Sequence, residues 1–265
     1  MRPCLLITPG ILSYERASRL QDALADARRA GDIPDVLVLL EHPPVVTIGR
    51  GGIVGRVAPG PPAVVEPGLR PPPTECGADD GLLVPRDELL ARGIEVHECS
   101  RGGKVTYHGP GQLVGYPVLD LSQHGRDLNA YLRNLEGSLI AALGSFDIAA
   151  LRRPGLTGVW TKGGKIAAIG IAVRHWITSH GFALNVSCDL APFDLIDPCG
   201  LRESGVTSMA RELRHAVPFD AVQCEVAQAL ARQFALDLQP CDPVPSPEEV
   251  SAVHLVNHIA AVRCS

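Results

Sequence analysis

The chain has 265 residues, of which 46% are hydrophobic, 20% charged and 4% aromatic, a composition typical of a globular protein with an aliphatic core. The formal net charge of −5 and the pI near 6.0 argue against an overall basic field, so we expect no nucleic-acid partner. No apolar run reaches the ~18 residues of a membrane span, and the amino terminus lacks a signal or transit pattern, so we expect no membrane partner.

The first part of the chain predicts one helix followed by two strands. Residues 13–30 place apolar side chains at helical spacing and stop at Gly31. Val36–Leu40 is a continuous apolar run of strand length, and Val45–Gly49 predicts a second strand. Residues 57–85 hold eight prolines and little apolar periodicity, which predicts an irregular, mobile surface insertion.

The rest of the chain mixes strands and helices without a regular βαβ rhythm. Strands are expected at Ile94–Cys99 and Leu113–Leu119, and two long neighbouring strands at Gly164–Arg174 and Trp176–Val186, with a turn near His175. Helices are expected at Asp127–Leu143 and Phe219–Leu236, and a last one from the capping box Ser246–Glu249. We therefore expect an α/β, α+β-like fold in which helices pack on a mixed sheet, forming a single domain over residues 1–265.

The segment Arg101–Gln112 contains five Gly or Pro residues around the β-forming triplet Val105–Tyr107. Glycine lets a backbone approach a ligand closely, and Arg101, Lys104 and His108 add hydrogen-bond donors and positive charge. Taken alone, the segment is equally compatible with a ligand loop and with a tight turn that leads into a buried strand.

A second segment places Lys165 at the entry to the apolar strand that begins at Gly164. A lysine in this position usually extends its amine to the surface. If the side chain is held inward, desolvation lowers its pKa and makes it a usable proton acceptor or a partner for a thiolate.

A third segment, Pro198–Gly200, places Cys199 on a fixed and unobstructed turn. The eight cysteines show neither CxxC nor paired metal spacing, which predicts a cytoplasmic protein with reduced thiols, no metal and no cofactor. A lone cysteine is more often a small buried hydrophobe than a nucleophile, and Cys188, Cys224 and Cys264 are assigned to that class.

Taken together, these segments resemble the lipoyl(octanoyl) transferase family, which is related to the catalytic domains of biotin and lipoate protein ligases. The resemblance extends over most of the chain and is carried, in order, by Glu41–Pro44, Thr47–Arg50, Arg101–Gln112, Lys165–Gly170, His180–Val186 and Pro198–Gly200. It implies the fold of those ligases, and a single catalytic domain in which residues 57–85 form a longer and more proline-rich insertion than is usual.

The resemblance also implies an activity, namely octanoyl transfer from octanoyl-acyl carrier protein to a lysine of a lipoyl domain. The implied acceptors are the lipoyl domains of 2-oxoacid dehydrogenase E2 subunits and the glycine cleavage H protein. Cys199 and Lys165 are the implied catalytic pair. The implied substrate-binding residues are Arg101, Gly102, Gly103, Lys104, Val105, Thr106, Tyr107, His108, Ala168, Ile169, Gly170, Gly181, Phe182 and Ala183.

The chemistry explains why such an enzyme needs a cysteine and an amine. A cysteine can divide the transfer into two steps through its own thioester, but at a pKa near ~8.5 only a few per cent of it is thiolate at pH 7. Lys165 as an ammonium would favour the thiolate, and as a neutral amine it would take the thiol proton; a coupled pair titrates as a unit, so both descriptions remain open. We expect the two side chains to lie within hydrogen-bond reach.

Several alternatives stay open. An ATP-dependent lipoate or biotin ligase has the same scaffold, a cysteine hydrolase needs a histidine oriented by Asn or Asp, and a carrier-binding module needs no catalysis. His180 and Asn185 are the only tempting hydrolase pair, and they are unlikely to cooperate because five residues along a strand point to opposite faces. For Tyr107, His108 and His180, a purely structural role is the alternative to a role in the site. Scattered basic residues form either a rim for an acidic carrier or a solvated set: Arg50, Arg56, Arg101, Lys104, Arg152, Arg153 and Arg174.

Overall fold

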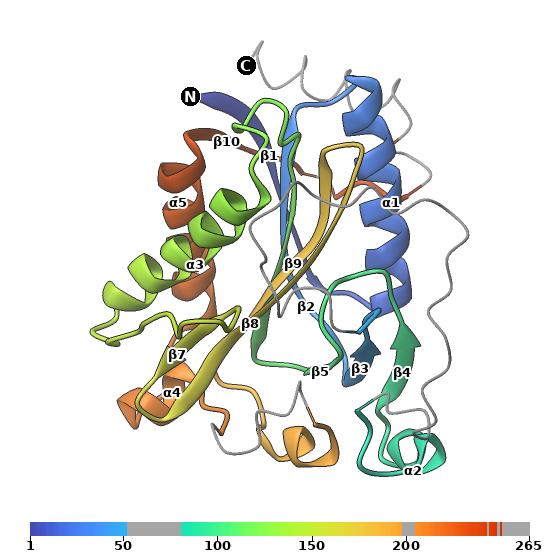
Figure 1. Cartoon of the computed structure of the whole chain (residues 1–265), viewed down its shortest axis with the longest axis vertical. Coiled ribbons are helices and arrows are strands. Elements are labelled where there is room, and N and C mark those ends of the chain that lie inside the picture. The colour runs from blue at the N-terminus through green and yellow to red at the C-terminus, as the bar shows by residue number, and fades with distance from the viewer. Residues whose placement is uncertain (52–80, 198–204, 243, 248–249, 251–265) are drawn as a thin grey trace.

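The computed structural model describes residues 1–51, 81–197, 205–242, 244–247 and 250. They form a seven-stranded sheet and a three-stranded sheet with helices packed around them (Figure 1). The strand order of the large sheet is β10 (Leu236–Pro240), β1 (Arg2–Ile11), β2 (Asp35–Glu41), β6 (Gln112–Val118), β9 (Ile177–Asn185), β8 (Gly164–Arg174) and β7 (Val159–Thr161). The small sheet has the order β4 (Glu95–Glu98), β3 (Val45–Ile48) and β5 (Val105–His108).

The large sheet is mixed and carries a helix layer on each face. β1 runs parallel to β2 and β10, whereas β2, β6, β9, β8 and β7 pair antiparallel in succession. Helix α1 (Tyr14–Ala30) packs on one face, and α3 (Leu128–Gly144) and α5 (Phe219–Phe234) pack together on the other (Figure 1). The shorter helical segments are α2 (Arg86–Ala91), α4 (Met209–Leu213) and the 3₁₀ turn η1 (Ala191–Leu195).

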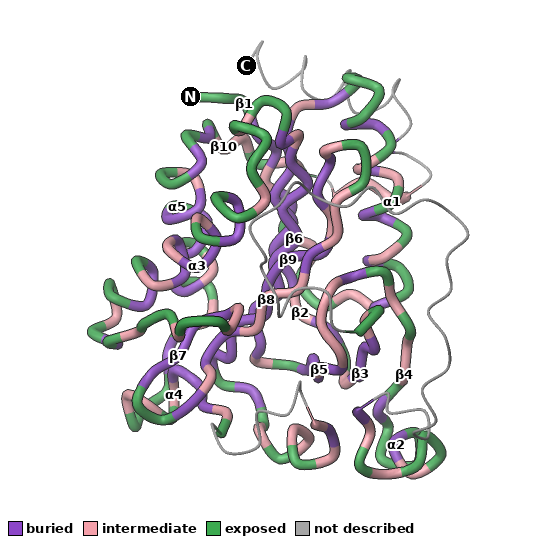
Figure 2. The backbone as a smooth tube through the Cα atoms, in the orientation of Figure 1, coloured by how far each residue is buried: buried purple, intermediate pink, exposed green. Residues whose placement is uncertain are grey.

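The continuous apolar run of β2 is explained by this sandwich. Successive side chains of a strand point to opposite faces. Leu37 and Leu39 accordingly join the core with α3 and α5, whereas Val38 and Leu40 join the core with α1. Figure 2 shows the resulting buried band through the middle of the sheet.

The helix boundaries follow from capping residues. The Ser13 side chain accepts a hydrogen bond from the Arg16 amide at the start of α1, and Gly31 ends the helix in the left-handed conformation with φ of 83°. Asp127 caps α3 by accepting from the amides of Asn129 and Ala130 at 2.8 and 3.1 Å. These two helices confirm the predictions from the sequence to within one residue.

Other elements differ from the expectation. The helix expected to reach Leu236 ends at Phe234, because Ala235 takes a left-handed φ of 54° and Leu236 pairs with Arg2 to begin β10. β1 was not expected, since prolines at positions 3 and 9 argue against an inner strand; Pro9 lies where the β1–β2 register shifts. The structure also contains β5, β7 and β10, which were not predicted. The predicted strand β3 belongs to the small sheet.

Two predicted segments fall largely outside the described residues. Of the predicted insertion, only Gly81–Pro85 is described, and there Leu82 forms an isolated bridge with Ile196. The helix predicted from Ser246 also falls mostly on residues outside the described part. Within the described ranges, no helix has both the length and the apolar composition needed to cross a membrane.

A buried ionic cluster holds the start of β2. Asp35 accepts hydrogen bonds from Arg28 Nε at 2.8 Å and from the Asp120 amide at 3.1 Å, and its second oxygen lies 2.7 Å from His124 Nε2. Burial, the largest influence, raises the pKa of Asp35, but the bonds from His124, Arg28 and Asp120 together lower it below its ordinary value. The cluster ties α1 and the loop after β6 to the sheet.

Candidate active site

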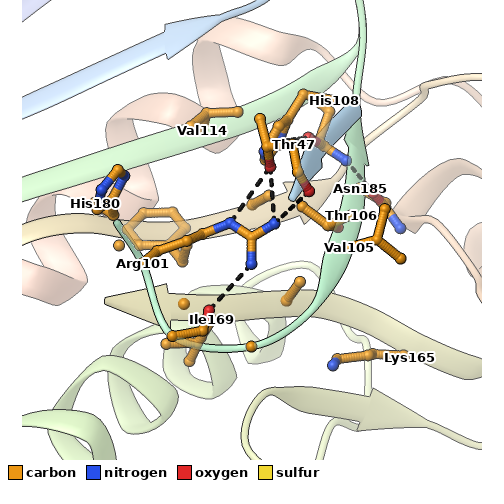
Figure 3. A pocket seen from close by; sticks show the side chains of 18 of the residues that line it. Thr47, Arg101, Val105, Thr106, His108, Val114, Lys165, Ile169, His180 and Asn185 are labelled. Atoms are coloured by element: carbon orange, nitrogen blue, oxygen red, sulfur yellow. Dashed lines mark hydrogen bonds between the residues drawn. The ribbon is translucent and has the colours of Figure 1, made fainter. Parts of the chain in front are cut away.

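One pocket lies between the two sheets, and it is walled by strands β5, β6, β8 and β9 and by the loop between β4 and β5 (Figure 3). Lys165 lies at one end of the view and His180 lies at the other, with Arg101 between them. The lining residues are Tyr14, Thr47, Arg101–Thr106, His108, Gln112, Val114, Tyr116, Lys165, Ala168–Gly170, His180–Ala183, Asn185, Phe193 and Val206.

The loop between β4 and β5 carries Gly102 and Gly103 and is called the glycine-rich loop below. It is the wall of the pocket that joins the two sheets. Its Gly102 amide donates to the Ile171 carbonyl of β8 at 2.9 Å, and the Lys104 carbonyl accepts from the Gly49 amide beyond β3 at 2.6 Å. Backbone hydrogen bonds in both directions fix the loop, so it forms a rigid part of the pocket.

Two glycines outside the loop make this close approach possible. A Cβ on Gly49 would lie 2.5 Å from the Gly103 carbonyl oxygen, and a Cβ on Gly170 would lie 3.0 Å from the Gly102 carbonyl oxygen. Side chains at these positions would separate the loop from β3 or from β8.

Arg101 is a buried structural cation of the pocket, only 8% exposed. Its Nη2 donates to the carbonyl and the hydroxyl of Thr47 at 2.6 and 2.8 Å, and its Nη1 donates to the Gly102 carbonyl at 3.0 Å (Figure 3). The planar guanidinium thereby links β3 to its own loop.

Three buried histidines lie in or next to the pocket: His108 and His180 line it, and the centroid of the His42 ring lies 5.7 Å from that of the His108 ring. Burial, as the largest influence, lowers the pKa of His42 to about 4, that of His108 to about 3 and that of His180 to about 4. At neutral pH all three rings are therefore uncharged, and the pocket side of the molecule presents no imidazolium.

These lowered pKa values predict a pH-dependent loss of stability. An unfolded histidine titrates near ~6.5, so between about pH 6.5 and 4 the unfolded chain binds protons that His42, His108 and His180 in the folded chain do not. The stabilisation is present above pH 6.5 and is lost as the pH falls, by roughly 3 kcal/mol for each ring at pH 4. Urea unfolding from pH 7 to pH 4, with NMR titration of the ring protons, measures it. A ring that titrates near 6.5 in the folded protein would contradict the prediction.

Lys165 is half-buried and lines the pocket at the start of β8. Its Nζ lies 5.2 Å from the ring centroid of Trp160, a fully buried side chain of the neighbouring strand β7. An aromatic face at this distance attracts an ammonium group. The Lys165 side chain therefore lines the pocket, whereas a lysine at the entry to a strand more often extends its amine to the surface.

The backbone of Lys165 is paired as well. Its amide donates to the Gly205 carbonyl at 3.0 Å, and its carbonyl accepts from the Thr207 amide at 3.0 Å. Residues 205–207, which follow segment 198–204 in the sequence, are thus hydrogen-bonded to the backbone of Lys165. Cys199 itself lies outside the described residues, so the expected proximity of its thiol to Lys165 stays a prediction.

Of the expected substrate-binding residues, all except Tyr107 line this pocket. The Tyr107 ring packs edge-on against Phe193 at a centroid distance of 5.5 Å, within the core under the small sheet. The sequence analysis did not single out Tyr14, Val114, Tyr116 and Phe193 as lining residues. Their apolar or strand-like local patterns carry no ligand signal, because only the packing of distant elements places them here.

The contacts of three further candidates are as follows. His180 lies opposite Lys165 and bonds to the Ser100 hydroxyl at 2.9 Å, so it does not orient Lys165. Asn185 bonds to Gln112, so the structure does not pair it with His180 as a hydrolase would require. Arg152 bonds to buried Glu136 at 3.0 Å, which separates it from a continuous basic rim. Among the described residues, no group of three or more His, Cys, Asp or Glu side chains is placed to hold a metal ion.

A family model and curated relatives both match this chain. Residues 77–231 match the family model of the lipoyl protein ligase A/B catalytic domain. The chain is 45% identical to the octanoyltransferase of Geobacter metallireducens over 241 residues, which is 89% of this chain and 97% of the relative. It is 43% identical over 241 residues to the octanoyltransferase of Synechococcus elongatus, which is 91% of each chain.

Solved structures show the same fold at low sequence identity. A chain from the archaeal lipoylation system of Thermoplasma acidophilum, a bi-partite lipoate protein ligase and its E2 lipoyl domain, superposes with a TM-score of 0.64 at 17% identity, covering 97% of this chain and 92% of that chain. Lipoate-protein ligase A bound with ATP gives 0.64 at 17%, covering 97% and 95%. The predicted fold, a mixed sheet with packed helices like that of these ligases, is confirmed.

Proposed function

The chain belongs to the octanoyltransferase family, and from this we propose that it moves an octanoyl group from octanoyl-acyl carrier protein to a lysine of a lipoyl domain through a thioester on Cys199. The family membership makes the protein a transferase that acts in lipoylation. The proposal adds three finer parts to this: the carrier-protein donor, the cysteine intermediate and the acceptors. The proposed acceptors are the lipoyl domains of 2-oxoacid dehydrogenase E2 subunits and the glycine cleavage H protein.

The observation that most directly supports it is the position of Lys165. The side chain lines the pocket together with the small and apolar residues of β8 and β9, and its backbone is paired with residues 205–207, which follow Pro198–Gly200 in the sequence. A thioester exchange requires an amine close to the reacting carbonyl group and an apolar slot for the acyl chain. Cys199, whose thiol we assign to the reaction, precedes Gly205 by six positions in the sequence.

In the proposed first step, Cys199 and Lys165 share one proton, as thiolate and ammonium. The thiolate attacks the carbonyl carbon of the donor thioester, and backbone amides of the Cys199 turn or of the glycine-rich loop stabilise the oxyanion. The carbon–sulfur bond to the carrier then breaks. The carrier's thiolate takes the proton of Lys165 and leaves as a thiol.

In the second step, the neutral amine of the acceptor lysine attacks the Cys199 thioester. An amide bond forms and the bond to the cysteine sulfur breaks. Lys165, now neutral, takes the proton released by the amine, which restores the starting pair. No cofactor is consumed, because the free energy of the donor thioester drives the amide bond.

The slot provides the affinity for the acyl tail. Ala168–Gly170 of β8 and Gly181–Ala183 of β9 lie side by side in the sheet, with Ile169 opposite Phe182. Because four of these six residues are Ala or Gly, we assign the acyl tail to the part of the pocket that they line next to the glycine-rich loop. Transfer of the tail from water yields roughly 0.8 kcal/mol per methylene, on the order of 5 kcal/mol in total.

Intact-mass analysis tests the proposal. After incubation with octanoyl-acyl carrier protein and no acceptor, the wild-type protein should gain one octanoyl group, and Cys199→Ala should gain none. Addition of a lipoyl domain should then move the octanoyl group to that domain. Modification of the lipoyl domain only from free octanoate and ATP would overturn the proposal in favour of a ligase, and an unchanged wild-type mass would overturn the intermediate.

A further inference from the structure

A line of buried polar side chains crosses from the small sheet to Lys165. His108 Nε2 lies 3.4 Å from the Thr47 hydroxyl, and His108 Nδ1 lies 2.7 Å from Gln112 Oε1. Gln112 Nε2 is 2.9 Å from Asn185 Oδ1, and Asn185 Nδ2 is 2.9 Å from the carbonyl of Thr207. All five residues are at most 7% exposed, so water does not compete for these bonds.

The orientation of both amides in this line is fixed by backbone carbonyls. Gln112 Nε2 also lies 3.1 Å from the Tyr107 carbonyl oxygen, and Asn185 Nδ2 faces that of Thr207. A carbonyl can only accept, so both side-chain nitrogens must donate and both side-chain oxygens must face the opposite way. Neither amide can be flipped without placing two acceptors against each other.

The state of His108 follows from the same reasoning. Gln112 Oε1 can only accept, so His108 carries its proton on Nδ1, and the neutral ring leaves Nε2 as an acceptor. Thr47 receives two donors from Arg101, at 3.3 and 2.8 Å, so its own hydroxyl proton is directed to His108 Nε2. Every bond therefore runs one way, from Arg101 to the carbonyl of Thr207.

The line ends where the backbone meets Lys165. The Thr207 amide donates to the Lys165 carbonyl at 3.0 Å, and the Lys165 amide donates to the Gly205 carbonyl at 3.0 Å. The Thr207 hydroxyl is held separately by Glu212 at 2.7 Å. Asn185 thus holds the Thr207 carbonyl, and the Thr207 amide pairs with Lys165 at the start of β8.

We propose that Asn185 and Gln112 are positioning residues, which use this one-way line of hydrogen bonds to hold residues 205–207 in register with Lys165. The inference rests on the proposed function for its kinetic consequence only. Because the line is directional, a change at any member is transmitted to its end. If Gln112 is made an acceptor, for example, Asn185 must turn, and its oxygen then faces the Thr207 carbonyl.

Two variants test the proposal with different readouts. Asn185→Asp keeps the shape of the side chain but removes the donor to Thr207, and Gln112→Glu removes the donor to Asn185. For both we expect the amide protons of Lys165 and Thr207 to exchange with solvent at least tenfold faster. We also expect kcat for octanoyl transfer to fall by about 30-fold, with the KM for the donor changed less than threefold.

Asp35→Asn is the matched control, because it breaks an equally buried network whose residues do not line the pocket. It should lower the unfolding midpoint without changing kcat or the exchange at Lys165. NMR of the wild type should show His108 protonated on Nδ1 and free on Nε2.

Three results would overturn the proposal: His108 protonated on Nε2, unchanged exchange at Lys165 and Thr207 in Asn185→Asp, or loss of kcat in Asp35→Asn to the same degree. The exchange and tautomer measurements need no turnover. A wild-type protein that fails to take octanoate from the carrier therefore refutes the proposed function alone, and the positioning claim is still decided by those two readouts.

Discussion

Lys165→Met should lower the rate of octanoyl transfer by about a thousandfold, within the range by which a positioned acid–base group contributes to a reaction. The variant loses the group that we propose both stabilises the Cys199 thiolate and takes the proton of the acceptor amine. Both steps are affected, so neither the thioester nor the amide should form at the normal rate. Single-turnover kinetics with octanoyl-acyl carrier protein, followed by mass, measures the two steps separately.

Methionine is chosen because it retains most of the aliphatic stem of Lys165. That stem lies beside Gly158, where an added Cβ would be 2.8 Å from Lys165 Cε, and it faces the Trp160 ring. The fold should therefore be retained, with an unfolding midpoint close to that of the wild type. Lys162→Met in the adjacent turn, an exposed lysine, is the matched control and should react normally. Normal turnover by Lys165→Met would remove this residue from the mechanism.

Gly115→Ala should shift the acyl preference toward shorter chains. Gly115 of β6 lies opposite Phe182 of β9, and a Cβ on Gly115 would overlap with the Phe182 ring. The ring also lines the pocket, so it has to move toward the space that we assign to the acyl tail. Loss of room for one or two methylenes costs about 1–3 kcal/mol each. We expect kcat/KM for the octanoyl donor to fall about 30-fold, and that for a hexanoyl donor to fall much less.

The control for this substitution is a glycine with open space around it. A Cβ on Gly144, at the end of α3, would meet no atom within 4 Å, so Gly144→Ala should leave the octanoyl-to-hexanoyl ratio unchanged. The double variant Gly115→Ala with Phe182→Leu should recover octanoyl transfer, because the smaller side chain vacates the slot. A ratio that stays at the wild-type value in a folded Gly115→Ala protein would show that Phe182 does not limit the tail.

Local signals were sufficient for some elements and insufficient for others. The caps at Ser13 and Asp127 and the long apolar runs of β8 and β9 are properties of contiguous residues, so the sequence predicts those elements to within a residue or two. β1 contains two prolines, of which Pro9 lies at a register shift and Pro3 pairs with Asp237 of β10, and β5 is a short strand next to a glycine-rich loop. Those strands exist because distant partners pair with them, which periodicity does not report.

The same distinction holds for the candidate site. Motifs with unusual composition, such as the glycine-rich loop and the entry to β8, point to the pocket from the sequence alone. Tyr14 and Val114 reach it only because α1 and β6 pack against β9. The roles of Asn185 and Gln112 depend on the direction of hydrogen bonds, and no sequence pattern encodes that direction.

The arrangement of β1 has a consequence for how the protein is made. Arg2–Ile11 can pair with Asp35–Glu41 soon after both leave the ribosome, but its other edge is completed only by Leu236–Pro240. Throughout most of synthesis that edge offers unsatisfied amides and carbonyls to any neighbouring nascent chain. Among the strands of the large sheet, the first to emerge is therefore the last to be enclosed, and crowding of ribosomes on one message should promote aggregation of incomplete chains more than of the finished protein.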